Sequence, residues 1–71
     1  MENKLSDKTE RLRLSLSAIV SDTMGKESGE LFYKFHLDDD AESLADGFKA
    51  LLEVILGPEL TKRKLDKAKK G

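Results

Sequence analysis

The chain contains no cysteine and only one histidine, His36, among its 71 residues. Disulfides are therefore excluded, and a structural metal site would have too few of its usual ligands. A chain of this length folded alone buries only about 60% of the surface that its unfolded form exposes, so its stability is marginal. Small domains that lack disulfides and metals commonly gain stability by association, and the composition therefore favours an oligomer.

Long apolar runs are also missing from the sequence. No stretch approaches the roughly 20 apolar residues that cross a bilayer, and residues 1–8 lack the apolar segment of a signal peptide. The lack of cysteine fits a reducing compartment. We therefore expect a cytoplasmic protein that binds no membrane and no cofactor.

No catalytic, metal-binding or phosphate-binding motif is recognisable either. His36 lies two residues before Asp38, but no nucleophile motif surrounds any serine. The acidic run Asp38–Asp40 lacks the ligand spacing of a calcium loop. It is explained more simply as the start of a helix, with Asp39 as the N-cap and acidic groups at the positive end of the dipole. The sequence thus predicts a protein that is not an enzyme.

Two stretches alternate polar and apolar residues, the pattern of half-buried strands. The first covers residues 11–20, RLRLSLSAIV, and the second covers residues 30–37, ELFYKFHL. Residues 21–29 between them contain two glycines among small and charged residues, which is typical of a turn. The pattern predicts an antiparallel β-hairpin whose inner face packs on the helix that follows. The residues expected inside are Leu12, Leu14, Leu16, Ala18, Val20, Leu31, Tyr33, Phe35 and Leu37 of the hairpin and Leu44, Phe48, Leu51, Leu52 and Ile55 of the helix.

The segment 41–56, AESLADGFKALLEVIL, has a clear helical period instead. Gly57 is expected to cap this helix and Pro58 to begin a short basic one. The prediction is an α+β fold, ββαα, with a flexible lead-in over residues 1–8, one domain over residues 9–57 and a short basic helix or frayed tail over residues 58–71. Two hairpins meeting edge to edge would form a four-stranded sheet covered by helices, which also protects the exposed strand edge.

Small residues form a second sector on the helix 41–56. A glycine inside a helix costs about 1 kcal/mol relative to alanine, so Gly47 needs a compensating contact. Either it relieves crowding within the chain, or it permits close approach of a second copy. The second alternative predicts a dimer interface composed of Ser43, Gly47, Ala50 and Val54.

Charge is unevenly distributed along the chain. Residues 37–58 contain six acids and one lysine, a net charge of −5, whereas residues 59–71 contain six bases and two acids, a net charge of +4. The basic end either extends and solubilises a helix or contacts an acidic partner. On the hairpin, the face turned away from the helix would carry bases beside an aromatic ring, which is either a solvated sheet face or a binding surface. The residues proposed to bind a partner or nucleic acid are Arg11, Arg13, Phe32, Lys34, His36, Lys62, Arg63 and Lys64.

These observations favour a small interaction or regulatory module that acts as a homodimer and binds another protein. The size resembles that of phage and mobile-element accessory proteins. The alternative is a nucleic-acid-binding dimer that uses the outer sheet face and the basic tail.

Overall fold

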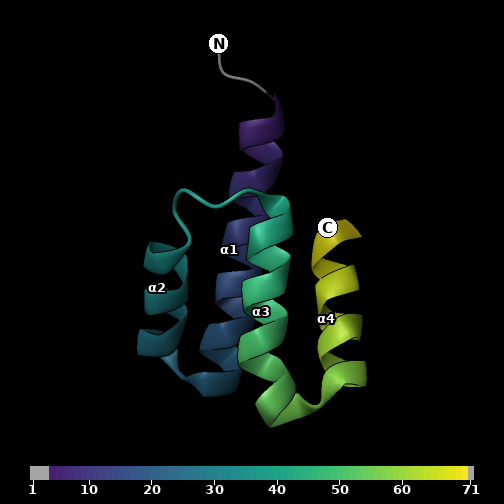
Figure 1. Ribbon diagram of the computed structural model, residues 1–71. Helices are drawn as coiled ribbons and strands as arrows, with labels where there is room; N and C mark the ends of the chain where they lie inside the picture. The colour runs from purple at the N-terminus through teal and green to yellow at the C-terminus, as the bar shows by residue number, and fades with distance from the viewer. Residues whose placement is uncertain (1–3, 71) are drawn as a thin grey trace.

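The computed structural model describes the backbone of residues 4–70 and the side chains of residues 8–70. It consists of four α-helices in the order α1 (Lys4–Met24), α2 (Lys26–Phe35), α3 (Ala41–Leu56) and α4 (Pro58–Lys70). Figure 1 shows α2 and α4 on either side of α3, with α1 behind them. Helix α1 packs against the other three helices, and α3 also packs against α4.

The α+β prediction is wrong, because residues 4–70 contain no strand or sheet. Neither expected strand is present: residues 11–20 lie within α1, residues 30–35 lie within α2, and residues 36–37 belong to the turn after it. The β-hairpin and the four-stranded sheet of the dimer are therefore corrected to a helical bundle. Residues 1–3 of the expected lead-in lie outside the described residues, and α1 begins at Lys4.

The alternating pattern in α1 was misleading because part of it also satisfies a helical period. Leu12, Leu16 and Val20 are four residues apart and buried on one side of the helix. Leu14, which alternation placed with them, is 53% exposed, while Arg13 is buried. Helix α1 therefore buries Leu12 and Leu16 and leaves Leu14, which lies between them in the sequence, on an exposed face.

Glycines separate the helices at two points. Gly25 has a φ of 109° and Gly57 a φ of 89°, conformations that side-chain-bearing residues rarely adopt. Pro58 begins α4, as the sequence predicts, because the first position of a helix needs no backbone N–H partner. These turns fold α2 back along α1 and α4 back along α3 (Figure 1).

Gly29 permits the close packing of α2 on α1. A Cβ atom at this position would lie 2.8 Å from the Ser17 carbonyl oxygen and 2.9 Å from the Ser21 Cβ. No side chain fits in that space without a shift of backbone. The two glycines that predicted a turn over residues 21–29 thus have different roles, since Gly25 ends α1 and Gly29 packs against it.

The core lies between α1 and α3, with contributions from α2 and α4. Phe48 and Leu44 of α3 are fully buried, and the Phe32 ring of α2 meets Phe48 edge-on at 6.3 Å between centroids. The buried apolar residues are Leu12, Leu16, Val20, Phe32, Leu44, Ala45, Phe48, Leu52 and Leu65. Six of the residues expected inside are instead exposed: Leu14, Ala18, Leu31, Phe35, Leu37 and Ile55.

Candidate interaction surface

A polar cluster fixes α2 and the turn after it against α1. The buried guanidinium of Arg13 forms an ion pair with Glu10, and the Tyr33 hydroxyl donates to the other Glu10 carboxylate oxygen at 2.5 Å. Arg13 also donates from Nε to the His36 carbonyl oxygen at 2.8 Å and from Nη2 to the Asp39 carbonyl oxygen at 3.4 Å. One buried arginine therefore binds two backbone carbonyls of the segment that joins α2 to α3.

The His36 ring is held in place on three sides. Its Nδ1 lies 2.5 Å from Asp39 Oδ2, and its ring centroid lies 4.4 Å from that of Phe32. On the third side it lies against Gly47 of α3, where an added Cβ would stand 2.6 Å from His36 Cε1. Gly47 thus makes room for a side chain of its own chain, which supplies one compensating contact for a glycine within a helix.

The acidic residues before α3 have different roles from the predicted ones. Asp40, not Asp39, is the N-cap of α3 and accepts from the Ser43 backbone N–H at 2.9 Å. This hydrogen bond lowers the pKa of Asp40, because it favours the ionised carboxylate. Asp39 contacts His36 instead.

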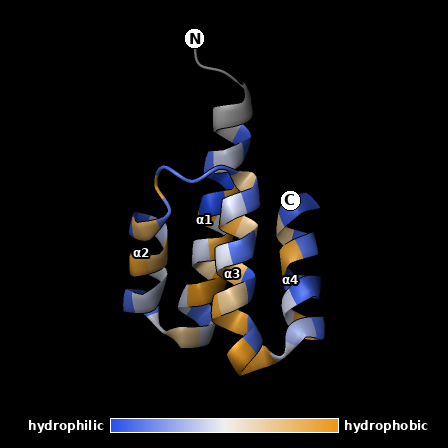
Figure 2. Cartoon of the chain, viewed as in Figure 1, coloured by the Kyte–Doolittle hydropathy of each residue, from blue (hydrophilic) through white to orange (hydrophobic). Residues whose placement is uncertain are grey.

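A groove lies between α2 and α3, whose backbones do not approach each other closely. Its volume is about 290 Å³. Figure 2 shows hydrophobic bands on both helices that border it. The groove is lined by Met24, Ser28, Leu31, Phe32, Phe35, His36, Gly47 and Leu51.

Large apolar side chains around this groove are exposed to solvent. Phe35 is 77% exposed and Leu31 is 52% exposed, and Val54, one helical turn beyond Leu51 on α3, is 86% exposed. We call the surface made of the groove, Phe35 and Val54 the α2–α3 face. A cluster of large exposed apolar residues beside a groove is typical of an interaction site.

The predicted dimer residues lie on α3 beside this groove. Gly47 lines the groove and is half-buried, whereas Ser43, Ala50 and Val54 are exposed. The small-residue sector is therefore part of the outer surface of the described chain and adjoins the α2–α3 face.

The residues predicted to bind a partner or nucleic acid do not gather on one surface. Phe32 is in the core, Arg13 is buried in its ion pair, and His36 is packed on Gly47. Arg11 and Lys34 are exposed on different helices. The basic residues of α4 form a separate group, with Lys62 and Arg63 exposed and Lys64 half-buried.

Sequence reasoning missed the role of Leu31, Phe35 and Leu51. Leu31 and Phe35 were placed inside because the strand pattern gave α2 the wrong inner face. Leu51 was placed inside by the helical period of α3, and it is half-buried, packed on the core while also lining the groove. A helical period over residues 26–36 puts Gly29 and Phe32 of α2 and its C-cap residue His36 on one side, and these three residues pack toward α1 and α3. That period was the available signal for the exposed pair Leu31 and Phe35.

Metal and membrane sites have no structural support in the described part of the chain. No group of three or more His, Asp or Glu side chains from residues 8–70 is placed to hold a metal ion. Likewise, none of the helices within residues 4–70 combines the length and the apolar character that crossing a bilayer requires. Comparison of the chain with protein-family models, curated proteins and solved structures gives no match.

Proposed function

We propose that this protein is a non-enzymatic helical interaction module that acts as a homodimer through the α2–α3 face and binds another protein. The observation that carries the dimer is the position of Phe35. This side chain is 77% exposed and stands at the edge of an apolar groove. The projecting Phe35 side chain and the groove lie on the same face. This face of one copy can therefore pair with the same face of a second copy, as a twofold symmetric interface requires.

In this arrangement Phe35 of each copy enters the groove of the other. A buried aromatic side chain removes about 150–250 Å² from water, and stable interfaces bury about 800 Å² on each partner. Leu31, Leu51 and Val54 add exposed apolar area around Phe35. Ala50, a small residue exposed on α3, leaves room for the partner helix, whereas the space over Gly47 is filled by His36 of the same chain.

The size of the chain supports the same proposal. A 71-residue chain without disulfides has a small core, and residues 8–70 contribute nine buried apolar side chains to it. Covering the α2–α3 face would extend that core across two copies. Folding and association are then linked, and the midpoint of thermal unfolding rises with protein concentration.

Sedimentation velocity with the variant Phe35→Glu tests the dimer. The wild type is expected to sediment as a dimer at micromolar concentration. A charge in place of the central aromatic residue is expected to weaken the dimer at least about 30-fold, the effect of losing a hot spot. Leu60→Glu on α4 is the matched control, because Leu60 is also exposed but lies outside the groove. A folded wild-type monomer throughout the micromolar range would overturn the proposal.

Nucleic-acid binding remains the second candidate, now supported by α4 alone. Lys62, Arg63 and Lys67 are exposed on this helix and offer cations for phosphate groups. A salt titration with single- and double-stranded DNA and RNA tests it, and binding that weakens steeply as salt rises would support it. The absence of binding at low salt would end this candidate.

A further inference from the structure

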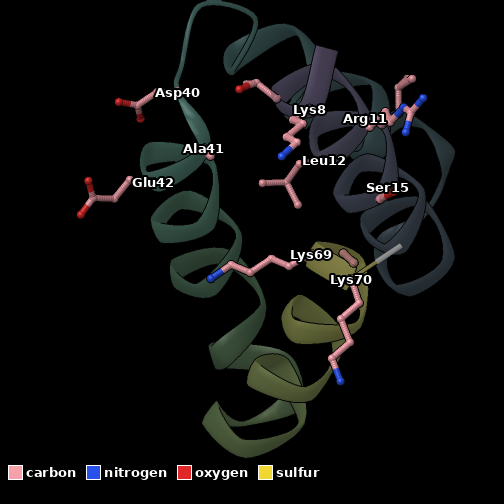
Figure 3. Close-up of a pocket in the computed structure, with 12 residues that line it drawn as sticks. Lys8, Arg11, Leu12, Ser15, Asp40, Ala41, Glu42, Lys69 and Lys70 are labelled. Carbon is pink, nitrogen blue, oxygen red and sulfur yellow. The ribbon is translucent and has the colours of Figure 1, made fainter. Parts of the chain in front are cut away.

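A second, larger groove lies on a different part of the molecule from the α2–α3 face. Its volume is about 880 Å³, and it is bordered by the first half of α1, the start of α3 and the end of α4 (Figure 3). We call it the α1–α4 groove. It is lined by Lys8, Thr9, Arg11, Leu12, Leu14, Ser15, Asp40, Ala41, Glu42, Ala68, Lys69 and Lys70.

The lining combines apolar side chains with cations. The apolar part consists of Leu12, Leu14, Ala41 and Ala68, and Leu14 is 53% exposed. The cations come from two helices that are distant in sequence, Lys8 and Arg11 from α1 and Lys69 and Lys70 from α4. In Figure 3, Lys69 extends from the end of α4 toward α3, and Lys8 lies between α1 and the start of α3, above Leu12.

These four cations are not neutralised within the described structure. None of them forms an ion pair with a side chain of residues 8–70. The lining also contains two carboxylates, Asp40 and Glu42, so its four cations leave an excess of positive charge. Asp40 accepts from the Ser43 backbone N–H, and in Figure 3 both acidic side chains extend from α3 on the side away from Leu12. An occupant with negative charge would therefore meet unpaired lysine and arginine side chains.

We propose that the α1–α4 groove binds an acidic amphipathic helix of a partner protein. Its apolar residues, spaced at i, i+3, i+4 and i+7, would cover Leu12 and Leu14, and its Glu and Asp residues would meet the four cations. Along α1 the lining runs from Lys8 to Ser15, about 12 Å of helix and enough for two turns of a partner. This inference goes beyond the proposed dimer, because it gives the second protein a site and a chemistry.

Other anionic occupants fit the lining less well. No aromatic side chain lines the α1–α4 groove within the described residues, so an unpaired base would have no ring on which to stack. The apolar part of the lining, Leu12, Leu14, Ala41 and Ala68, would lie unused beneath a phosphate backbone. A helix with one apolar and one acidic face would contact both the apolar residues and the cations of the lining.

A fluorescence anisotropy titration with a synthetic helix tests this proposal. The probe is a labelled peptide of roughly 18 residues, long enough to be helical, with Leu at the apolar spacing and Glu elsewhere. We expect binding that weakens with salt, and at least about tenfold weaker binding to the double variant Lys69→Glu, Lys70→Glu. Leu14→Ser is expected to weaken it severalfold without changing the salt dependence, since it removes only apolar contact.

Controls separate this groove from general attraction between opposite charges. The double variant Lys62→Glu, Lys67→Glu makes the same charge change on α4 outside the lining and should alter binding less than about twofold. Equal losses in both double variants would overturn the proposal, as would no binding or tighter binding of single-stranded DNA at this groove. Repeating the titration with Phe35→Glu separates the groove from the dimer, because this variant is expected to lose the dimer and still bind the peptide. A wild type that binds the peptide but is monomeric would refute only the dimer.

Discussion

Tyr33 reports directly on the polar cluster that joins α1 to α2. The hydrogen bond to Glu10 raises the pKa of Tyr33, because a nearby carboxylate favours the neutral phenol, and partial burial and the charge of Glu10 act in the same direction. Arg13 acts in the opposite direction and lowers it. Because Tyr33 is the single tyrosine in a chain without tryptophan, its ionisation can be followed by ultraviolet absorbance alone.

Replacing Glu10 with Gln is expected to lower the pKa of Tyr33 toward the ordinary value of about 10. The measurement is an alkaline titration of tyrosinate absorbance in the wild type and the variant. Glu30→Gln, an exposed change on α2, serves as the control for the loss of one negative charge. Equal Tyr33 titration curves for the wild type and Glu10→Gln would contradict the contact.

The same contact has a defined effect on stability. A tyrosine with a raised pKa in the folded state stabilises that state fully below the ordinary pKa and loses this contribution as the pH rises through the raised value. The stability advantage of the wild type over Glu10→Gln should therefore shrink in strongly alkaline solution. Chemical unfolding at several pH values measures that difference.

Residue-scale prediction succeeded where the signal was local. The acidic run before residue 41 was identified as a helix start, but the cap is Asp40, one residue later than expected. The sequence contains no signal for the contact of Asp39 with His36, because it depends on how the turn after α2 is held by Arg13. Gly47 was identified as needing a close neighbour, and His36 is one such neighbour.

At the scale of elements, α3 and α4 were predictable and α1 and α2 were not. Helix α3 spans Ala41–Leu56, the predicted range, since its apolar period, its acidic start and Gly57 all agree. In α1 the alternation of polar and apolar residues over 11–20 resembled a strand. Arg13 was expected to face solvent because it is charged, but it is buried. Tertiary contacts decided this case, because Arg13 has Glu10 and two carbonyl oxygens as partners.

Gly29 is the residue on which the pairing of α1 and α2 depends most closely. In an isolated helix, Gly→Ala stabilises by about 1 kcal/mol. Here Gly29→Ala is expected to destabilise by about 1–3 kcal/mol, because the new Cβ meets the Ser17 carbonyl oxygen and Ser21. Thermal unfolding followed by circular dichroism measures the change.

The control for that experiment is Glu30→Ala, which also places alanine in α2 but at an exposed position. It is expected to change the free energy of unfolding by less than about 0.5 kcal/mol. If Gly29→Ala were instead as stable as the wild type or more stable, the close packing of α2 on α1 would be refuted.

At the scale of the whole molecule, one helix organises two separate surfaces. Helix α1 lies behind the others and contacts all three (Figure 1). The groove of the α2–α3 face and the α1–α4 groove have no lining residue in common. The sequence predicted association from small size and from the small residues of α3. It placed the basic surface on a sheet, and that placement followed from the wrong period in α1 and α2.

Methyl NMR spectra recorded during dilution test the central claim, the dimer through the α2–α3 face. The account predicts that the methyl signals of Leu31, Leu51 and Val54 shift with protein concentration, because these groups leave a dimer interface. Leu14 and Leu60 are internal controls, exposed but outside the lining of that groove, and their signals should stay constant. Signals that do not move at any concentration, or that move at Leu14 and Leu60 instead, would contradict the account.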